Sequence, residues 1–435
     1  MRILFVTASY PPESVGGVEL HVAGLCRQMR ARGHEVAVVA RTGRADVGHL
    51  RVAHDEVEGV PVARVGNTFE DATELRRLYA HEGLADLVAA EVARVRPDVV
   101  HVHHLTCLST LVPARVAARG VPVVMTLHDF WMGCPRGQRI TAGLDVCPTI
   151  RLEKCVPCLR ELWPHLLGRG GAGPDVPAAE RDAADREQLV AYHEAVRAAL
   201  RACDRLVTPS AFMKRMYVAY GVPEAALRVV ENGIPVEGWA RPHEPAARAA
   251  LRIGYVGSVI PSKGVHVLLE AVRALGDPSR FTVEVHGAVL PFHNDHTYAR
   301  RLEALRAGYG SSIVLAGPYA PGDLPALLAR LDVIVVPSLW YEAYGLTVRE
   351  AFCAGVPVVA SDHGALAEAI EHGVTGLLVA AGDADALAAA LRRLAEDPPL
   401  RRGLAAAARA RVRDERDAAD EMLALYGELV AGDAR

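Results

Sequence analysis

Two glutamates flank a glycine-bearing turn within residues 337–361, a stretch that reads PSLWYEAYGLTVREAFCAGVPVVAS. The pattern predicts a strand before this turn and a helix from near Gly345 to about Ala354. The first N–H groups of a helix lack helical partners, and together with the helix dipole they favour an anion such as a diphosphate. Glu342 precedes the turn and Glu350 lies on the helix, so both can reach ligand hydroxyls. A ligand with sugar hydroxyls on both sides of a diphosphate is a nucleotide sugar.

A glycine pair near the N-terminus is a second candidate for phosphate binding. Gly16 and Gly17 follow the first apolar run and precede a predicted helix that begins near Val18. Without side chains, their peptide groups can approach a phosphate closely. A tight turn between a strand and a helix explains the same pair equally well. The spacing is not that of the dinucleotide fingerprint GxGxxG, which disfavours NAD binding.

Lys263 and His128 are placed where parallel strands are predicted to end. Lys263 follows the run YVGS and the turn IPSKG, and a compact cation there suits a departing nucleoside diphosphate. His128 ends the run VPVVMTL, and ligands of open α/β sheets bind at the carboxyl ends of strands. The alternatives without a catalytic role are that Lys263 is simply exposed to solvent and that His128 is a hydrogen-bonded structural residue. The nearby His101 and His103 alternate along a strand, where packing is favoured over metal binding.

Four cysteines lie within 25 positions, with twelve, seven and two residues between them: Cys134, Cys147, Cys155 and Cys158. Four thiols at such spacing suit a structural zinc ion, and an iron–sulfur cluster is a weaker alternative. A metal would order a long loop that lacks a core of its own. Two disulfides or reduced, partly buried thiols explain the same residues without a metal. The pair Asp383 and Asp385 has the D-x-D spacing of a metal site, but capping of the helix that follows explains it better.

The elements that must position these residues alternate along the whole chain. Short apolar runs rich in β-branched residues are separated by amphipathic helical stretches, which predicts parallel sheets covered by helices. The length of 435 residues favours more than one domain. The composition changes over residues 234–250, where proline, glycine and charge replace periodic apolar residues, so we expect a domain boundary there. Residues 166–182 predict a mobile loop.

Composition restricts the function classes. Apolar residues make up 51% and charged residues 23%, as in a soluble globular protein. The formal charge of −4 lacks the basic excess of a nucleic-acid-binding protein. No apolar run reaches the 18 or so residues of a transmembrane helix, and the N-terminal run suits a buried strand better than a signal peptide, so we expect a cytoplasmic protein. Basic stretches at 27–34 and 400–413 could contact a membrane surface peripherally, although solvated helix faces explain them better.

Five segments in the same order resemble the family 4 retaining glycosyltransferases, also called group 1 glycosyltransferases. Glu342 and Glu350 match the E-x7-E signature of that family within a more specific pattern, PS-x3-E-x2-G-x4-EAxxxGxPV. The other four segments are SYPPESVGGVELHVAGL near the N-terminus, TLHDFW at 126–131, ENGIP at 231–235 and YVGSVIPSKGVHVLLEA at 255–271. The resemblance covers nearly the whole chain and is weakest over about 160–200.

This resemblance implies the GT-B fold, in which two Rossmann-like, doubly wound α/β domains face each other across a cleft. The expected division is an acceptor-binding domain at 1–238, a nucleotide-sugar-binding domain at 251–414 and a C-terminal helix at 415–435 that packs back on the first domain. The implied reaction is transfer of a sugar from a nucleotide diphosphate sugar to an acceptor hydroxyl with retained configuration. The implied route is front-face, with the leaving diphosphate assisting deprotonation and no catalytic metal. The acceptor stays open among a saccharide, a lipid-linked saccharide and a secondary metabolite.

The resemblance also implies roles for individual residues. Glu350 would bind the ribose and Glu342 the donor sugar, while His128 would contact the donor sugar at the bond that breaks. Lys263 would hold the diphosphate, and Gly17 would lie against the donor phosphate and sugar. The remaining implied donor-binding residues are Gly16, Ser258, Tyr344, Gly345, Leu346 and Thr347.

One position departs from the family pattern. Most members have an arginine where this chain has Ser258, so half of the expected Arg and Lys pair on the diphosphate is missing. Arg136, Arg139 and Arg349 are candidates to supply that charge. The departure keeps alternatives open: a nucleotide-sugar epimerase or a phosphorylase of the same fold, or a degenerate protein that binds a nucleotide or glycan without catalysis.

Overall fold

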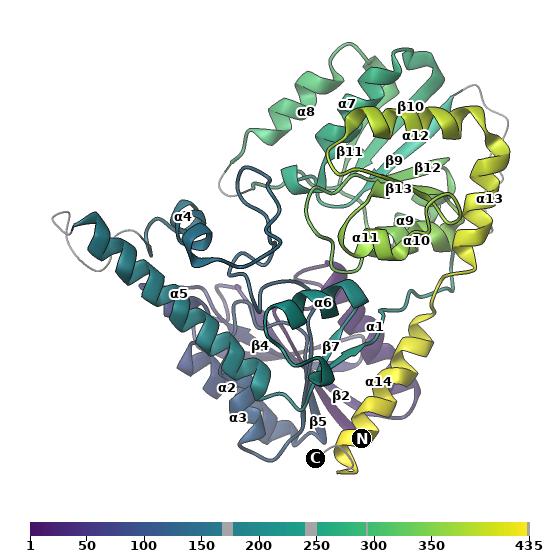
Figure 1. Cartoon of the computed structure of the whole chain (residues 1–435). Helices are drawn as coiled ribbons and strands as arrows, with labels where there is room; N and C mark the ends of the chain where they lie inside the picture. Colours follow the sequence, from purple (N-terminus) through teal and green to yellow (C-terminus); the bar gives the residue numbers. More distant parts are fainter. Residues whose placement is uncertain (168–176, 240–249, 293–294, 433–435) are drawn as a thin grey trace. The chain divides into compact units, whose positions relative to one another are not determined.

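The computed structural model describes residues 1–167, 177–239, 250–292 and 295–432, and the chain divides into two compact units (Figure 1). The N-terminal unit consists of Met1–Gln138, Pro148–Asn232 and Glu415–Arg435. The C-terminal unit consists of Arg139–Cys147 and Gly233–Asp414. Residues 240–249 of the expected boundary segment lie outside the described residues.

The N-terminal unit contains a sheet of eight described strands in the order β3-β4-β2-β1-β5-β6-β7-β8. All neighbouring strands pair in parallel except β3 and β4, which are antiparallel. Chain order therefore reverses between β1 and β5, which makes the carboxyl ends of these strands a topological switch point. The strands are β1 (Arg2–Thr7), β2 (Glu35–Thr42), β3 (Val52–Val57), β4 (Val60–Gly66), β5 (Val99–Val102), β6 (Val123–Thr126), β7 (Arg205–Thr208) and β8 (Leu227–Val229).

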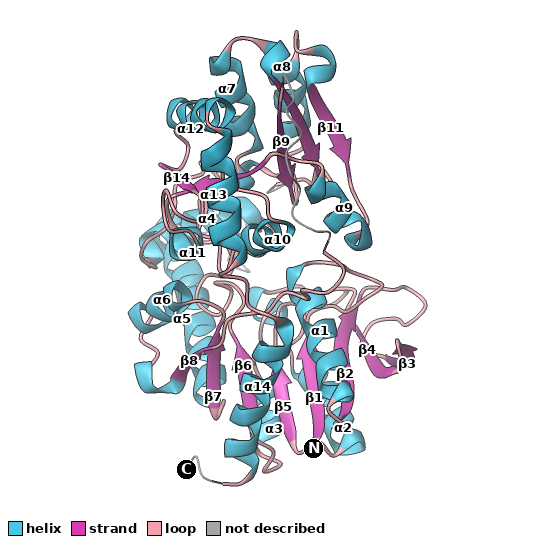
Figure 2. Cartoon of the chain, turned by 90° about the vertical axis from the view of Figure 1, so that its right-hand side faces the viewer, coloured by secondary structure: helices cyan, strands magenta, loops and turns pink. Residues whose placement is uncertain are grey.

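Helices cover both faces of this sheet (Figure 2). The helices of this unit are α1 (Gly17–Ala31), α2 (Glu82–Val95), α3 (Val112–Ala117), α4 (Leu152–Leu162), α5 (Ala178–Arg201), α6 (Ala211–Ala219) and α14 (Glu415–Val430), with 3-10 turns η1 (Leu75–Leu78) and η2 (Glu224–Ala226); among the described residues, α4 packs against α5 and not on the sheet. The last helix, α14, packs beside α1, and Met422 and Tyr426 share a buried cluster with Phe5 of β1 and Met29 of α1. The C-terminal end of the chain thus forms part of the core of the N-terminal unit.

The C-terminal unit contains six described strands, all parallel, in the order β11-β10-β9-β12-β13-β14. Its switch point lies between β9 and β12. The strands are β9 (Leu251–Val256), β10 (Phe281–His286), β11 (Ile313–Gly317), β12 (Val333–Val336), β13 (Val358–Ser361) and β14 (Leu377–Val379). The helices are α7 (Val265–Leu275), α8 (Tyr298–Arg306), α9 (Leu324–Ala329), α10 (Leu346–Ala354), α11 (Gly364–Ala369), α12 (Ala384–Glu396) and α13 (Pro398–Arg409), with turns η3 (Pro261–Lys263), η4 (Pro278–Arg280), η5 (Gly310–Ser312) and η6 (Pro321–Asp323).

Two strands, β3 and β14, were not among the apolar runs that predict the sheets. The strand β3 reads VAHDEV, and its middle residues are exposed at the edge of the sheet, so burial does not select apolar residues there. Its pairing with β4 depends on a tight turn at Glu58 and Gly59, both with positive φ. The strand β14 has three residues, too few to form a periodic pattern. Both are edge strands, because β3 is the first strand of the eight-stranded sheet and β14 is the last strand of the six-stranded sheet.

The segment predicted as a mobile loop, 166–182, is only partly described. Residues 168–176 lie outside the described residues, and α5 already begins at Ala178, so the helix takes over part of the expected loop. Asp383 caps α12 by accepting the N–H of Ala386 at 2.8 Å, which confirms the capping interpretation of the D-x-D pair. Within the described ranges, none of the helices combines the length and apolarity that a bilayer crossing requires.

Candidate active site

In the C-terminal unit, the loops after β9 and β12 meet at the switch point. The backbone N–H of Leu339 donates to the carbonyl of Ser262 at 2.8 Å, which ties the IPSKG turn to the loop after β12. Gly264 has φ +74°, and a Cβ there would lie 1.9 Å from the carbonyl oxygen of Pro337. No other residue fits this approach without moving the backbone. The two loops that carry Lys263 and Glu342 are therefore held together by main-chain contacts.

Lys263 and Glu342 form an ion pair at that junction, with Nζ 2.7 Å from Oε1. Ser338 Oγ and Trp340 Nε1 also donate to Oε1 of Glu342, at 2.6 and 2.9 Å. Burial raises the pKa of Glu342, but Lys263 and these hydrogen bonds outweigh it and hold the pKa below its usual range. The ammonium of Lys263 also lies 5.1 Å from the centre of the Trp340 ring. The pair places a fixed cation and a fixed carboxylate beside the start of α10.

The helix α10 begins at Leu346, and Gly345 is its N-terminal capping residue, which confirms the helix predicted from the E-x7-E segment. Gly345 has φ +75°, and a Cβ there would lie 2.8 Å from Cδ2 of Leu366. The N–H groups of Leu346 and Thr347, at the start of the first turn, have no partners within the helix, whereas that of Val348 donates to the carbonyl of Gly345 at 3.1 Å. Beneath this turn, the buried Arg349 donates to the carbonyl of Tyr344 and its guanidinium lies 3.7 Å from the Tyr344 ring centre.

Glu350 lies one and a half turns into α10 and differs from Glu342 in its surroundings. Burial alone raises the pKa of Glu350 to about 7. Tyr319 and Cys353 are near enough for the Glu350 charge to raise their own pKa values further, after burial as the main cause. Among the described residues no cation lowers this pKa, so hydroxyl donors of a ligand would stabilise the Glu350 carboxylate.

The structure places Ser258 and the three candidate replacement arginines in different settings. Ser258 is exposed, and its carbonyl accepts the hydroxyl of Tyr255 at 2.7 Å. Arg349 is buried against Tyr344. In the N-terminal unit, Arg136 donates to Sγ of Cys158 at 2.8 Å, and Arg139 donates to the carbonyl of Cys147 at 2.7 Å within the C-terminal unit. Each of the three guanidiniums already has a local partner.

In the N-terminal unit, the glycine pair opens α1, but part of its donor capacity is used. The N–H of Gly16 donates to Oε2 of Glu19 at 3.1 Å, and a Cβ on Gly16 would lie 2.7 Å from that oxygen. Glu19 also accepts the hydroxyl of Ser14 at 3.3 Å. A carboxylate thus already satisfies the Gly16 N–H, which leaves Gly17, the first residue of α1, as the better candidate for a phosphate contact.

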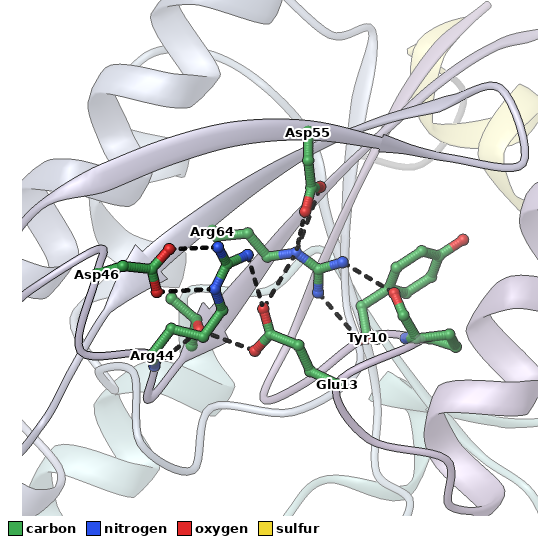
Figure 3. Close-up of polar contacts among 8 residues, drawn as sticks. Tyr10, Glu13, Arg44, Asp46, Asp55 and Arg64 are labelled. Atoms are coloured by element: carbon green, nitrogen blue, oxygen red, sulfur yellow. Dashed lines mark hydrogen bonds and ion pairs between the residues drawn. The ribbon is translucent and has the colours of Figure 1, made fainter.

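A buried arginine holds the segment that leads to the glycine pair (Figure 3). Arg64 is 1% exposed, and it donates to the carbonyls of Tyr10 and Pro11 at 2.9 and 2.8 Å. Its Nε lies 3.1 Å from Asp55 and 3.7 Å from Glu13. The guanidinium therefore joins strand β4 to the chain between β1 and α1, which it stabilises by both charge and hydrogen bonds.

Replacing Arg64 by methionine should lower the free energy of unfolding by about 1–3 kcal/mol, because the carbonyls of Tyr10 and Pro11 lose their charged hydrogen-bond donor. Arg44→Met is the matched control, since Arg44 pairs with Asp46 and lies near Glu13 but is 46% exposed on its side chain. The control should change stability by less than about 1 kcal/mol. Urea unfolding of both variants measures the difference, and equal losses would show that Arg64 does not hold the segment.

His128 lies at the carboxyl end of β6, next to two other histidines. Its Nε2 is 2.8 Å from Nδ1 of His103, and the two rings are stacked with centroids 5.1 Å apart. His21 of α1 meets His128 edge-on, with ring centroids 5.3 Å apart. Burial, and then the neighbouring histidines, lower the pKa of His128 well below its usual value. His128 is therefore neutral at physiological pH and suited to hydrogen bonding rather than to charge.

A cavity of about 780 Å³ lies in the N-terminal unit beside these elements. Its lining includes Gly17, His104 and Asp129 together with the aromatic residues Trp131 and Trp163. His104 Nε2 lies 2.9 Å from Oδ2 of Asp129, and although burial opposes it, Asp129 raises the pKa of His104. This volume suits a drug-sized or small saccharide ligand. Gly17 and Asp129, the residue after His128, therefore both line the cavity.

The metal prediction for the four cysteines stays untested. Among the described residues, two groups have three or more ligand atoms within 4.8 Å of one another, and neither contains a cysteine. The groups are His21, His103 and His128, and His49, Asp71 and His81. In the second group Nδ1 of His81 accepts the N–H of Leu84, so its proton lies on Nε2, 2.7 Å from Asp71. That hydrogen bond accounts for His81 without a metal.

Sequence reasoning missed several residues that shape the site. Trp340 and Ser338 contact Glu342 and lie within the same motif, so their closeness along the chain was a usable signal. His363 follows β13 and donates from Nε2 to the carbonyl of Ser338 at 2.8 Å, and it could have been found from its place at a strand end. Glu19 gave no signal, because its contact with Gly16 depends on the helix start.

Two family models match the chain over its two units. The model described as "Glycosyl transferase 4-like domain" matches residues 16–233, and the model "Glycosyl transferases group 1" matches residues 242–411. The chain belongs to this glycosyltransferase family and has the GT-B fold. It is a retaining glycosyltransferase that transfers a sugar from a nucleotide-sugar donor.

Named relatives cover nearly the full length. The chain is 29% identical over 439 residues to "Glycogen synthase" of Mycobacterium tuberculosis, covering 96% of this chain and 91% of the relative. It is 30% identical to "D-inositol 3-phosphate glycosyltransferase" of Acidothermus cellulolyticus, covering 89% and 79%. Among solved structures, Anabaena HepE in complex with UDP and glucose matches 98% of this chain and 100% of HepE with a TM-score of 0.70 at 20% identity. The last match supports the fold.

Proposed function

We propose that this protein uses a uridine diphosphate sugar as its donor and binds it in the C-terminal unit. The observation that carries the proposal is the set at the switch point: the Lys263–Glu342 ion pair, the start of α10 at Gly345, and the shielded Glu350. A diphosphate at the helix start would find N–H donors and the Lys263 cation together. HepE, a protein of the same fold, has been solved with UDP and glucose, which supports uridine as the base.

The proposed roles follow from these surroundings and from the family pattern. Glu350 accepts hydrogen bonds from the ribose hydroxyls, and Glu342 contacts the donor sugar. Lys263 stabilises the leaving diphosphate, with the first-turn N–H groups of Gly345, Leu346 and Thr347 as neutral donors beside it. Tyr344 shapes the turn through its stacking on Arg349, and Ser258 supplies a hydroxyl at the position where most members have a cation.

In the N-terminal unit, His128 contacts the donor sugar and Gly17 approaches the donor phosphate. Gly16 supports Gly17 by donating its N–H to the Glu19 carboxylate, which fixes the start of α1. Transfer follows a front-face route in which the departing phosphate oxygen takes the proton of the acceptor hydroxyl, so the reaction needs no metal. The cavity of about 780 Å³ receives the acceptor, because Gly17 and Asp129, the neighbour of His128, line it.

The test is a thermal-shift screen of UDP, ADP and GDP with their sugars, followed by mass spectrometry of the products. A ligand at 100 times its Kd stabilises the folded state by about 2.7 kcal/mol, which such a screen detects. We expect UDP and a UDP-sugar to give the largest shifts, and the product to keep the anomeric configuration of the donor by NMR. Nucleotide binding without turnover of any donor would instead indicate a degenerate binding protein.

Zinc binding by Cys134, Cys147, Cys155 and Cys158 is a separate proposal. We expect elemental analysis of purified protein to find close to one zinc per chain, because four thiols in a long loop satisfy tetrahedral coordination. Replacing Cys155 and Cys158 together by serine should remove the metal. Replacing Cys203 by serine is the control and should leave the metal bound, because the Cys203 thiol donates to the carbonyl of Ala199 near the end of α5. A metal-free protein whose thiols all titrate with a thiol reagent would reject the site.

A further inference from the structure

The three histidines His21, His103 and His128 form the most closely packed titratable cluster near the proposed sugar contact. Their ligand atoms lie within 4.8 Å of one another, and His103 is 1% exposed. A divalent cation would add two positive charges here. Besides burial, the described groups that lower the pKa of His128 are His21, His104 and His101, and the carboxylate of the adjacent Asp129 is already paired with His104. The cluster is better explained by hydrogen bonding among neutral rings.

The contact between His103 and His128 has two possible proton arrangements. Nδ1 of His103 lies 2.8 Å from Nε2 of His128, so one of these nitrogens carries the proton and the other accepts it. If His128 donates from Nε2, then neutral His103 must carry its own proton on Nε2. If His103 donates from Nδ1, then its Nε2 holds only a lone pair.

The surroundings of the other His103 nitrogen decide between them. Nε2 of His103 is buried and has no hydrogen-bond partner among the described residues. A buried N–H without an acceptor is rarer and less favourable than a buried lone pair without a donor. The His103 ring packs against Phe5, with centroids 5.4 Å apart, and against His101 at 4.0 Å, so it has no room to turn its nitrogens toward solvent. The arrangement with His103 as donor is therefore favoured.

We infer that His103 is a positioning residue that donates its Nδ1–H to Nε2 of His128 and so fixes the tautomer of His128 that carries its proton on Nδ1. His128 then presents one N–H donor, in a set direction, to an oxygen of a bound sugar. Burial keeps both imidazoles neutral, since it lowers the pKa of each well below its usual value. The inference about function rests on the proposed role of His128, but the tautomer itself does not.

Neighbouring contacts hold His103 in its orientation. On β5, which ends just before His103, His101 has Nδ1 2.5 Å from the Tyr426 hydroxyl of α14 and Nε2 2.7 Å from Oγ1 of Thr126. Both nitrogens of His101 therefore have hydrogen-bond partners, which fix the orientation of the ring that packs against His103. The C-terminal helix thus acts on the proposed catalytic histidine through two buried rings.

The first test reads the tautomer directly in the wild-type protein. Histidine-labelled protein is examined by long-range ¹H–¹⁵N correlation NMR, with the His128 signals assigned through their loss in His128→Gln. We expect His128 to show a protonated Nδ1 and an unprotonated Nε2 between pH 6 and pH 8. A proton on Nε2, or a mixture of both tautomers, would overturn the inference whether or not the protein transfers sugar.

The second test uses two variants of nearly equal shape. His103→Asn retains an N–H donor near the position of Nδ1, whereas His103→Leu removes it. If His103 orients His128, the leucine variant should lose up to about 100-fold in kcat with a smaller change in donor KM, because a misplaced group disrupts the reacting geometry. The asparagine variant should keep most of the activity and the wild-type His128 tautomer. Equal kcat values for the two variants would overturn the positioning role, and if either fails to fold, the wild-type spectrum still decides.

Discussion

Replacing Lys263 by methionine should lower kcat by about 100- to 1,000-fold, the usual effect of removing one group that stabilises developing charge. Lys263 lies 2.7 Å from Glu342, and the contact between Ser262 and Leu339 ties its turn to the loop after β12. If it holds the leaving diphosphate, the loss appears in kcat more than in donor KM, because charge develops on that group as the bond breaks. Steady-state kinetics with the preferred donor measures both constants.

The same change should also affect stability, which gives a control. Without Lys263, Glu342 keeps the hydrogen bonds from Ser338 and Trp340 but loses its counter-charge, and we expect about 1–3 kcal/mol less stability at pH 7. Adding Glu342→Gln to the methionine variant removes the stranded charge, so the double variant should regain stability. It should not regain kcat. A double variant that recovers both would mean that Lys263 serves the fold and not the reaction.

Replacing Glu350 by glutamine should stabilise the free protein at high pH while weakening nucleotide binding. Burial raises the pKa of Glu350 from 4.5 to about 7. A carboxyl whose folded pKa is raised contributes stability that is fully present below pH 4.5 and is lost as the pH rises through 7. At pH 8 the ionised side chain therefore destabilises the native state by roughly 3 kcal/mol, since each pKa unit corresponds to about 1.4 kcal/mol.

The variant should thus gain stability over the wild type between pH 4.5 and pH 8, and denaturant unfolding across that range measures the gain. Glu187→Gln, at an exposed position of α5, is the control and should show no such trend. Nucleotide binding should weaken by about 1–3 kcal/mol, because the amide is a poorer acceptor for ribose hydroxyls than a carboxylate. A Kd for UDP equal to that of the wild type would remove the ribose-binding role. Unchanged stability at pH 8 would show that Glu350 is better solvated than its surroundings indicate.

These two glutamates illustrate how far the sequence could be followed. Their spacing in the E-x7-E segment predicted a helix start between them, and α10 begins within one residue of the expected position. Their electrostatic difference could not be predicted. Glu342 has a lowered pKa because Lys263, 79 positions away, folds next to it, whereas Glu350 has a raised pKa because it is buried. Neither the distant partner of Glu342 nor the burial of Glu350 can be inferred from the residues next to them in the sequence.

The glycine pair shows a similar limit. A helix start after Gly16 and Gly17 was predictable from the residue types, and α1 begins there. The capture of the Gly16 N–H by Glu19 follows from side-chain direction on the first turn of α1, and it shifts the phosphate-binding role toward Gly17. The edge strand β3 was missed for a related reason, since its exposed residues carry no periodic signal.

By itself the sequence determined the α/β class, the family and the residue types at the carboxyl ends of the strands, because alternation of apolar runs and the spacing of motif residues are local properties. Only the tertiary structure decided which of those residues meet. It paired Lys263 with Glu342, buried Arg64 under the segment before the glycine pair, and stacked His103 on His128. Such contacts join segments that are distant along the chain, and their energies depend on burial that no local pattern records.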